Sequence, residues 1–577
     1  MKISRILEKK DLVKLQLIFL LNFLIFFFEF ISLASIPLFV SFIFELKTFL
    51  NKFENFGIYF FSNTKNEILV QYLGLAIILI FLVKNIFFYY YVHIQGKFVA
   101  NIKVKLSKKL LNFYVSSPFS YHLNNNPAQL TRNTTNSIDG LSAYILRLVE
   151  LLKESLAVLV IFILLMFFVD PIITISIFLL FLIFGFFYLR FIRPTYKKKA
   201  KTNENYKVSF IQTVNETFGA IKDIKLLNKE DEIVKFYHQF RSKYEKNLFQ
   251  FFILQKIPKL LLETLSIFII TITALLFFNS GMDLLNFLTI LSLVVVALVR
   301  FIPAFNSIIS SIFFIKIYQP VLDIIISELN KIERHEHDIS KTNNTKSFKK
   351  IDYKTNLISL RNISFYYEKE KDFTLNDINL DIKEGTILGV TGETGSGKST
   401  LFHIILGLLK PKSGNVFFKG IDINLDIKNW RDQIGYIAQN IYLLDDTIEK
   451  NISFNFLNDE INKKKLDFSI KMACLEKKIN ELPLGLKTKV GNDGLRLSGG
   501  EKQRIALARA IYRDPDIFFM DESTSALDSE TEEKIISNLK NNFSSKTIIL
   551  IAHRKTTIEA CDKIINLVNG SISEKIK

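Results

Sequence analysis

A glycine-rich segment flanked by two regular elements constrains this chain more than any other feature. The segment matches the pattern G-x-x-x-x-G-K-[ST] and consists of Gly392, Glu393, Thr394, Gly395, Ser396, Gly397, Lys398, Ser399 and Thr400. The apolar residues 386–391 predict a strand before it, and residues 401–409 predict a helix after it. Glycines let a backbone wrap closely around phosphates, and a helix N-terminus directs N–H groups at an anion. The segment therefore predicts a site for nucleotide phosphates, with Lys398 on the β- and γ-phosphates and Ser399 on Mg²⁺.

Downstream motifs exclude the alternative of a chance glycine-rich turn. Residues 497–501 read Leu-Ser-Gly-Gly-Glu and open a predicted helix. Residues 517–520 and 548–552 form unbroken apolar runs, which are typical of fully buried parallel strands. The residues that directly follow these runs are Asp521, Glu522 and His553.

These motifs, in this order, resemble the nucleotide-binding domain of an ATP-binding-cassette (ABC) transporter. The resemblance implies ATP and Mg²⁺ as cofactors and ATP hydrolysis coupled to transport. The implied metal ligands are Ser399, Gln439 and Asp521, and the implied catalytic residues are Glu522, His553 and Gln439. The glutamate would orient or deprotonate water, and the histidine would contact the γ-phosphate.

The same resemblance implies that two copies of the chain share each ATP. Tyr367 would stack on the adenine, with Tyr366 as the neighbouring alternative. Ser498, Gly499 and Gly500 would direct their donors at ATP held by a second copy. Because one chain carries one cassette, a homodimer with two equivalent sites is expected.

Long apolar blocks fill residues 1–320 of the 577-residue chain. A membrane span needs roughly 20 apolar residues. Six spans are predicted, at residues 17–44, 68–92, 141–169, 172–192, 250–279 and 284–317. The long loops 93–140 and 193–249 and the N-terminus are rich in Lys and Arg, which places all three in the cytoplasm. The expected location is the bacterial inner (plasma) membrane, with the ATPase domain also cytoplasmic.

This arrangement resembles the exporter-type ABC transmembrane domain. The predicted fold class is an α-helical transmembrane domain with six spans, followed by an α/β P-loop ATPase domain. The predicted boundaries are 1–330 for the transmembrane domain, 331–356 for a linker and 357–577 for the nucleotide-binding domain. In that family a coupling helix at each loop tip docks on the ATPase, and the tips are predicted near 124–131 and 218–229. Residues 47–66 are predicted to form an amphipathic helix at the outer membrane interface.

The net charge of +18 could indicate nucleic-acid binding. Lys/Arg-rich cytoplasmic loops explain the charge better, so no nucleic-acid partner is expected. Cys474 and Cys561 show no metal-ligand spacing, and they suit a reducing cytosol.

Charged residues interrupt the predicted spans, and such residues face water or each other because lipid exposure is costly. The cations Lys84, Lys259 and Arg300 are predicted to line the path of an anionic substrate. The alternative is pairing with Glu29 and Glu263, which would only fix helix packing.

Residues 297–306 resemble the sixth span of bacterial flippases for lipid-linked oligosaccharides of the protein-N-glycosylation type. Lys84, Lys259 and Arg300 fall where that family carries arginines, although lysine lacks the bidentate fork that suits a diphosphate. The leading interpretation is an ATP-driven flippase for a polyprenyl-diphosphate oligosaccharide, in contact with membrane lipids. The alternatives are a multidrug or lipid A-type exporter and, from another class, a nucleotide-gated channel or regulator.

Overall fold

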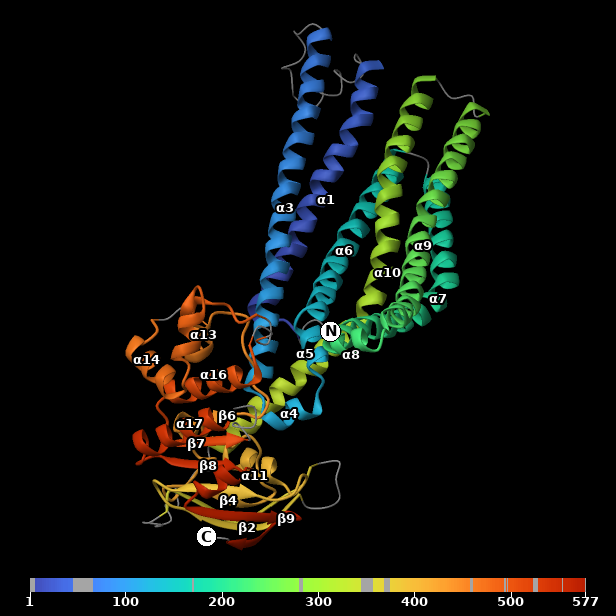
Figure 1. The fold of residues 1–577 in the computed structure, drawn as a ribbon. Coiled ribbons are helices and arrows are strands. Elements are labelled where there is room, and N and C mark those ends of the chain that lie inside the picture. Colours follow the sequence, from blue (N-terminus) through green and yellow to red (C-terminus); the bar gives the residue numbers. More distant parts are fainter. Residues whose placement is uncertain are drawn as a thin grey trace. The chain divides into compact units, whose positions relative to one another are not determined.

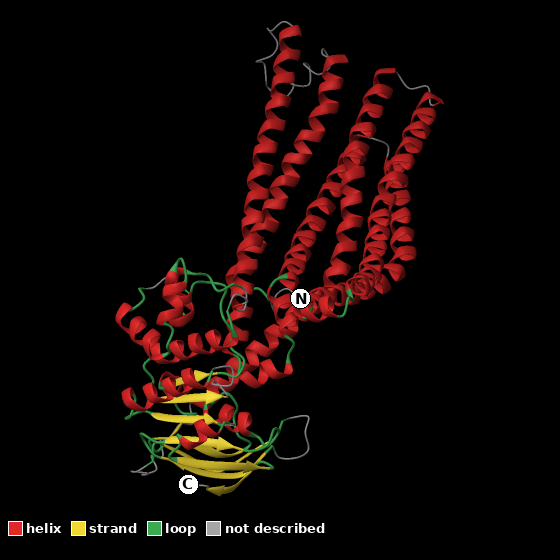
Figure 2. Cartoon of the chain, viewed as in Figure 1, coloured by secondary structure: helices red, strands yellow, loops and turns green. Residues whose placement is uncertain are grey.

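The computed structural model describes residues 6–44, 66–168, 171–279, 284–343, 356–367, 374–456, 460–491, 494, 497–521, 528–552 and 554–575. It divides into two compact units. The first unit comprises residues 1–116 and 126–337, and the second comprises residues 117–125 and 338–577. Figure 2 shows that the first unit is helical and that strands belong to the second.

The helical unit is built from long helices, most of them longer than a bilayer requires. They are α1 (Lys9–Phe44), α3 (Asn66–Ser116), α6 (Asn136–Phe168), α7 (Pro171–Gly219), α9 (Glu230–Asn279) and α10 (Leu284–Asn343), and Figure 1 labels each one. The short helices α5 (Pro127–Thr134) and α8 (Ile221–Leu226) lie in the two long loops. Pro258 lies inside α9, and Pro303 and Pro320 lie inside α10. Each proline removes a backbone donor from its helix and favours a kink there.

Six predicted spans fall on these six helices, but the count of six is not confirmed. Within the described residues, five helices contain a segment long and apolar enough to cross a membrane, in α1, α3, α7, α9 and α10. α6 is absent from that set. It carries five charged residues, all before residue 155, which are Asp139, Arg147, Glu150, Lys153 and Glu154.

Aromatic side chains form the core between α6, α7, α9 and α10. Phe181 lies with its ring centroid 4.4 Å from that of Phe301, and Phe301 stacks on Phe305 at 5.4 Å. Gly185 permits this approach, because a Cβ atom there would come within 2.8 Å of the Phe305 ring. The packing fixes the rotation of α10 and therefore the direction in which its polar residues point.

The second unit contains two sheets. The first has the order β2 (Leu375–Ile382), β1 (Ile358–Phe365), β4 (Ser413–Phe418) and β5 (Ile421–Asp422), with antiparallel pairs. The second has the order β10 (Ser571–Lys575), β9 (Lys563–Val568), β3 (Ile387–Thr391), β8 (Thr547–Ile551), β7 (Ile517–Asp521) and β6 (Ile434–Ile437). From β9 to β6 all pairs are parallel.

Helices cover this parallel sheet. They are α11 (Lys398–Ile405), α12 (Ile427–Asp432), α13 (Ile448–Ser453), α14 (Lys463–Met472), α15 (Glu476–Glu481), α16 (Gly499–Tyr512), α17 (Ser529–Asn542) and α18 (Lys555–Glu559), with a 3₁₀ turn at Gly485–Lys487. One core joins α11 to the two sheets, and another joins the parallel sheet to α13, α14, α16 and α17. Both faces of the strands are therefore buried, as their continuous apolar sequences predict.

The first long loop contributes a helix to the second unit. α4 (Phe119–Asn124) follows Pro118, and Phe119 packs on the core that contains α11. The predicted tip at 124–131 was therefore placed too late, because it begins at the last residue of α4. The second predicted tip, 218–229, contains α8.

Two further predictions meet the limits of the described residues. α10 continues to Asn343, so the first part of the predicted linker 331–356 is helical, and residues 344–355 are not described. The predicted amphipathic helix at 47–66 lies almost entirely outside the described residues.

A buried polar cluster ties the first long loop to α10. Glu328 on α10 is 4% exposed, and it accepts a hydrogen bond of 3.0 Å from the Tyr114 hydroxyl of α3. That hydroxyl accepts one of 3.2 Å from the Asn133 amide of α5. Lys331 pairs with the other Glu328 oxygen at 2.7 Å. One carboxylate thus joins three helices through charge-assisted bonds.

We predict that Glu328→Ala lowers the midpoint of thermal unfolding of the detergent-solubilised protein. The substitution leaves the Tyr114 hydroxyl buried beside a cavity, at a cost of about 1–3 kcal/mol. Glu333→Ala, at an exposed position one and a half turns later, is the matched control. Equal midpoints for the two variants would show that the cluster contributes no stability.

Candidate functional site

The carboxyl ends of four adjacent parallel strands form the candidate ATP site. β3, β8, β7 and β6 are neighbours in that order, so their carboxyl ends share one edge of the sheet. Ligands of parallel sheets bind at this edge. The residues that follow the four strands include Lys398 and Ser399 after β3, Asp521 and Glu522 at β7, Gln439 after β6 and His553 after β8. The topology thus gathers motifs that are up to 160 residues apart in the chain. Glu522 and His553 lie outside the described residues.

The loop between β3 and α11 has the backbone of a phosphate cradle. Gly392, Gly395 and Gly397 have φ angles of 144°, 87° and 99°, in a region that side chains with a Cβ atom rarely adopt. A Cβ atom at Gly392 would lie 2.4 Å from the Leu567 carbonyl oxygen, so only glycine fits there. Gly395 has no such neighbour within 4 Å, which leaves that side of the loop open.

Lys398 lies across this loop. The residue is only 7% exposed. Its Nζ donates to the Gly392 carbonyl at 2.7 Å and to the Glu393 carbonyl at 2.8 Å. The ammonium is thereby held at the mouth of the cradle, where phosphate oxygens can replace the two carbonyls. Ser396 has a buried hydroxyl with no hydrogen-bond partner among the described residues.

The two tyrosines proposed for adenine stacking point differently. The Tyr367 hydroxyl lies 3.2 Å from the Thr400 hydroxyl of α11, and its ring contacts Phe365. Tyr366 instead stacks beneath the Lys412 ammonium, with Nζ 5.0 Å from the ring centroid. Proximity to the loop helix favours Tyr367 as the residue beside the nucleotide.

Oxygen donors suited to Mg²⁺ end two of the strands. Asp521, 7% exposed, closes β7, and Gln439 follows β6. Burial and the charge of Asp521 raise the pKa of Tyr436 to about 12, which shows that the carboxylate lies near this strand. With the Ser399 hydroxyl these residues supply the hard oxygen ligands that Mg²⁺ prefers, usually completed by substrate phosphates and water. Within the described residues no cluster of three His, Cys, Asp or Glu side chains offers another metal site.

The Leu-Ser-Gly-Gly-Glu motif forms the start of α16. Ser498 is the N-cap, and its hydroxyl accepts from the Glu501 amide at 3.3 Å while Glu501 accepts from the Ser498 amide at 2.8 Å. This reciprocal capping leaves Gly499 and Gly500 in the first turn with their N–H groups at the helix end. Burial opposes ionisation of Glu501, but the hydrogen bond from Lys478 and that from the Ser498 backbone lower the pKa of its carboxyl.

A buried carboxylate that sequence reading missed lies beside the end of β8. Glu532 on α17 is 1% exposed, accepts from the Thr557 hydroxyl at 2.7 Å and pairs with Arg554 at 2.8 Å. Arg554 follows His553 directly, so this pair holds the chain next to a predicted catalytic residue. A lone glutamate in a polar helix carries no sequence signal of burial.

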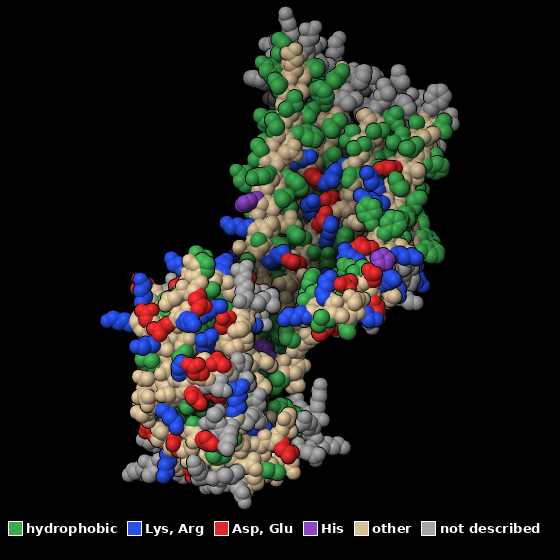
Figure 3. Space-filling view, viewed as in Figure 1, with side chains coloured by type: hydrophobic (Ala, Val, Ile, Leu, Met, Phe, Trp, Pro, Cys, Tyr) green, Lys and Arg blue, Asp and Glu red, His purple; other side chains and the backbone are tan. Residues whose placement is uncertain are grey.

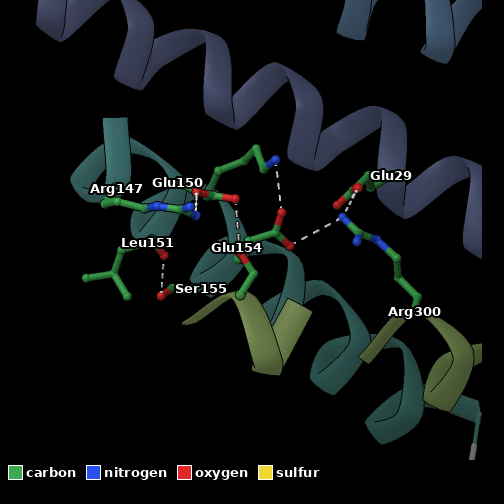
Figure 4. A network of polar contacts seen from close by, with 9 residues as sticks. Glu29, Arg147, Glu150, Leu151, Glu154, Ser155 and Arg300 are labelled. Atoms are coloured by element: carbon green, nitrogen blue, oxygen red, sulfur yellow. Dashed lines mark hydrogen bonds and ion pairs between the residues drawn. The ribbon is translucent and has the colours of Figure 1, made fainter. Parts of the chain in front are cut away.

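The predicted substrate cations occupy the helical unit, where acids surround Arg300. Figure 4 shows the Arg300 guanidinium between Glu29 of α1 and Glu154 of α6. Its Nη2 lies 2.5 Å from Glu29 and 3.5 Å from Glu154. The alternative of ion pairing is therefore realised for this residue, with a second acid that the sequence did not indicate.

Lys259 and Lys84 form weaker ionic contacts than Arg300. Lys259 lies 3.6 Å from Glu263, and both side chains are about half exposed, at 56% and 45%. Lys84 is half-buried, and its ammonium lies 4.7 Å from the centroid of the Phe81 ring. Among the described residues Lys84 has no ion-pair partner, although it lies in the field of Glu29 and Arg300.

Comparison with protein families agrees with both halves of the structure. Residues 18–302 match the ABC transporter transmembrane region, and residues 375–525 match the ABC transporter domain. The chain belongs to the ABC transporter family. With one transmembrane region and one ATP-binding domain, it has the organisation of an exporter half-transporter.

Curated relatives match a little over a third of this chain. The leukotoxin export ATP-binding protein LtxB of Aggregatibacter actinomycetemcomitans is 41% identical over 221 residues, which are 38% of this chain and 31% of that protein. The ATP-dependent lipid A-core flippase of Neisseria meningitidis serogroup B is 37% identical over 219 residues, which are 38% of this chain and 35% of that protein. The matched segment thus spans about a third of the length of either relative.

A solved structure shares the fold of the whole chain. It is the structure of a bacterial Atm1-family ABC exporter with ATP bound, and the TM-score is 0.74 at 18% sequence identity. The alignment includes 98% of this chain and 95% of that chain. The predicted fold class of a helical transmembrane domain followed by an ABC ATPase is therefore confirmed. The predicted resemblance to oligosaccharide flippases concerns the substrate, and these relatives do not show that substrate specificity for this chain.

An aromatic contact in the second unit involves a titratable residue. The Phe119 ring of α4 lies edge-on to the His403 imidazole of α11, with centroids 5.4 Å apart. Burial lowers the pKa of His403 below its usual 6.5, and the Nδ1 atom has no hydrogen-bond partner among the described residues. The folded protein therefore holds this imidazole neutral at pH values where the unfolded chain protonates it.

We predict that stability falls with acidification through this residue. Its contribution is fully present above the unfolded pKa of 6.5 and declines as the pH falls toward the lowered folded pKa. His403→Gln should flatten the decrease of the unfolding midpoint between about pH 7.5 and about pH 5.5. His238→Gln, at an exposed position, is the control and should leave the slope unchanged. Identical slopes for both variants would contradict the assignment.

Proposed function

We propose that two copies of this chain form an ATP-driven exporter that flips an anionic lipid-linked substrate to the outer leaflet of a bacterial inner membrane. A polyprenyl-diphosphate oligosaccharide is the proposed substrate. The observation that carries the anionic class is Lys84, a half-buried cation on a predicted span without an acidic partner among the described residues. Charge inside a membrane domain is costly unless it is paired, hydrated or used. An anionic head group would supply the missing partner.

The ATP site acts by positioning and by neutralising charge. The loop amides and Lys398 bind the β- and γ-phosphates, and α11 directs its N-terminus at them. Mg²⁺, held by Ser399, Gln439 and Asp521, would neutralise phosphate charge when bound. Glu522 orients or deprotonates the attacking water in this proposal, because it follows Asp521 at the carboxyl edge of the sheet.

A second copy would complete the site. Ser498, Gly499 and Gly500 begin α16, which packs with α13 and α14 on the helical side of the cassette. In the proposed head-to-tail dimer, these donors meet ATP bound by the other copy. ATP binding closes the dimer, and hydrolysis reopens it.

We predict that Glu522→Gln retains ATP binding and loses steady-state hydrolysis by at least about 100-fold, the usual contribution of a general base. The variant should accumulate as a closed dimer in the presence of ATP. Glu533→Gln, at an exposed position of α17, is the control and should hydrolyse ATP normally. Hydrolysis near the normal rate in Glu522→Gln would remove this residue from the proposed role.

A second candidate substrate is a lipid A-type molecule, which the similarity to the lipid A-core flippase favours. Both candidates are phosphorylated amphipathic lipids, so Lys84, Lys259 and Arg300 would serve either one. Transport of each lipid in proteoliposomes separates the two candidates.

We predict that Arg300 acts on the substrate in addition to pairing with Glu29. Arg300→Gln leaves Glu29 without its cation, while Glu154 keeps Lys153, and breaking a buried pair costs about 3–5 kcal/mol. The double variant Glu29→Gln/Arg300→Gln removes an acid together with the cation and should recover the unfolding midpoint. Flipping of a polyprenyl-diphosphate oligosaccharide in proteoliposomes should stay impaired in the double variant, while basal ATP hydrolysis continues. Recovery of flipping together with stability would assign Arg300 to packing alone.

A further inference from the structure

Two buried polar side chains in the helical unit contain polar atoms without a hydrogen-bond partner among the described residues. Asn22 of α1 and Tyr91 of α3 are each 2% exposed. Both polar atoms of the Asn22 amide and the Tyr91 hydroxyl are buried and, within the described residues, make no hydrogen bond of acceptable geometry. The two side chains adjoin each other between the helices, where the Tyr91 hydroxyl interacts with Asn22 outside good hydrogen-bond geometry. Native proteins leave few such groups, and each one calls for an explanation, such as strain, a bound water or ion, or a function.

These side chains belong to polar faces that meet inside an apolar unit. Asn22 and Glu29 are seven residues apart on α1, and Lys84 and Tyr91 are seven apart on α3, so each pair shares a helix face. Glu150 and Glu154 of α6 lie close enough to influence Tyr91 electrostatically. Figure 3 shows charged side chains gathered in a hollow among the hydrophobic surfaces of the helical unit.

The acids of this region already have cationic partners. Glu150 pairs with Arg147 at 2.6 Å, Glu154 with Lys153 at 2.9 Å, and Glu29 with Arg300. Figure 4 shows these carboxylates turned toward their partners. A metal cation would compete with three fixed positive charges, and a phosphate beside Tyr91 would meet Glu150 and Glu154. The hydrogen-bonding groups that remain unused are therefore neutral. They are the donors and the acceptor of the Asn22 amide, and the Tyr91 hydroxyl, which both donates and accepts.

We propose that Asn22 and Tyr91 form a subsite for the neutral, hydroxyl-rich part of the substrate, a sugar ring of its glycan. Sugar hydroxyls both donate and accept, so they can satisfy the amide and the phenol together. Asn22 lies about two turns along α1 from Glu29, which pairs with Arg300, so the subsite adjoins the proposed path of the anionic group. This inference rests on the proposed function, because one substrate would carry both the anionic group and the sugar ring.

The burial of the subsite implies that α1 separates from α3 when the sugar enters. In the arrangement of the structure, the unpartnered groups destabilise the contact between these helices. Hydroxyl groups that satisfy them would stabilise a separated arrangement, which links occupation to helix movement. Removing the unpartnered atoms should therefore strengthen the helix contact and weaken sugar binding at the same time.

The test uses Tyr91→Phe and Asn22→Leu, which delete the polar atoms and keep most of the side-chain volume. The matched controls are Tyr90→Phe and Asn85→Leu, both at exposed positions of α3. The purified full-length protein in a polyoxyethylene detergent is titrated with three probes. They are a polyprenyl diphosphate, the same diphosphate bearing a disaccharide, and an uncharged alkyl maltoside, and thermal stabilisation reports binding.

We expect the disaccharide to increase the affinity of the unsubstituted protein for the diphosphate, and the alkyl maltoside to stabilise it. Each subsite variant should have a higher unfolding midpoint without probe and lose about tenfold in affinity for both sugar-bearing probes, the loss of one or two hydrogen bonds. Binding of the sugar-free diphosphate and both control variants should be unchanged.

The outcomes separate the two proposals. Equal affinities with and without the disaccharide, or unchanged affinities in Tyr91→Phe and Asn22→Leu, would overturn the sugar subsite while the anionic substrate stands. Binding of the alkyl maltoside that depends on these residues, with no binding of the diphosphate, would overturn the anionic substrate and retain the subsite. Absence of binding by all three probes would overturn both. A lower midpoint in both variants, with no change in affinity, would show that the side chains hold only water.

Discussion

A bilayer offers no hydrogen bonds to a backbone, and this constraint governs the helical unit. α3, α9 and α10 satisfy it as single helices of 51, 50 and 60 residues, even where proline lies within them. With the backbone committed to helices, substrate recognition within the spans falls to side chains. The few polar ones therefore carry a disproportionate share of specificity, and their placement depends on helix rotation. Phe301 and Phe305 fix that rotation for α10 by stacking against α7.

Charge balance makes the polar interior tolerable. Arg300 contacts an acid on α1 and another on α6, so the charge of this α10 residue is balanced by two other helices. A paired interior can be hydrated during helix movement at lower cost than one holding an isolated charge. The partners of Arg300 can separate from one another while one of them keeps its cation. Such a network suits helices that must move past each other.

The sequence signals of the ATP-binding domain are local, and the glycine-rich segment has the predicted context between a strand and a helix. A glycine-rich turn between a strand and a helix specifies Lys398, and an apolar run specifies Asp521 without any knowledge of distant contacts. Glu29 and Glu263 were named as alternative partners of the membrane cations, and both form ion pairs. Glu154 could not be predicted, since it becomes a neighbour of Arg300 only through the packing of α6 against α10. The burial of Asn22 was missed for the same reason. The position of α4 was predictable in principle, because Pro118 precedes its first turn and proline favours helix starts.

The contact between α4 and α11 places part of the first long loop beside the helix that follows the phosphate-binding segment. α11 begins at Lys398, and His403 lies five residues later, about 7.5 Å along the helix axis at 1.5 Å per residue. α11 thus connects the phosphate cradle at its N-terminus with the imidazole that Phe119 touches. The ring contact is edge-on and tightly packed against the core, which resists sliding. Residues 117–125 of the first long loop therefore share one compact unit and one apolar core with the helix that begins at the phosphate cradle.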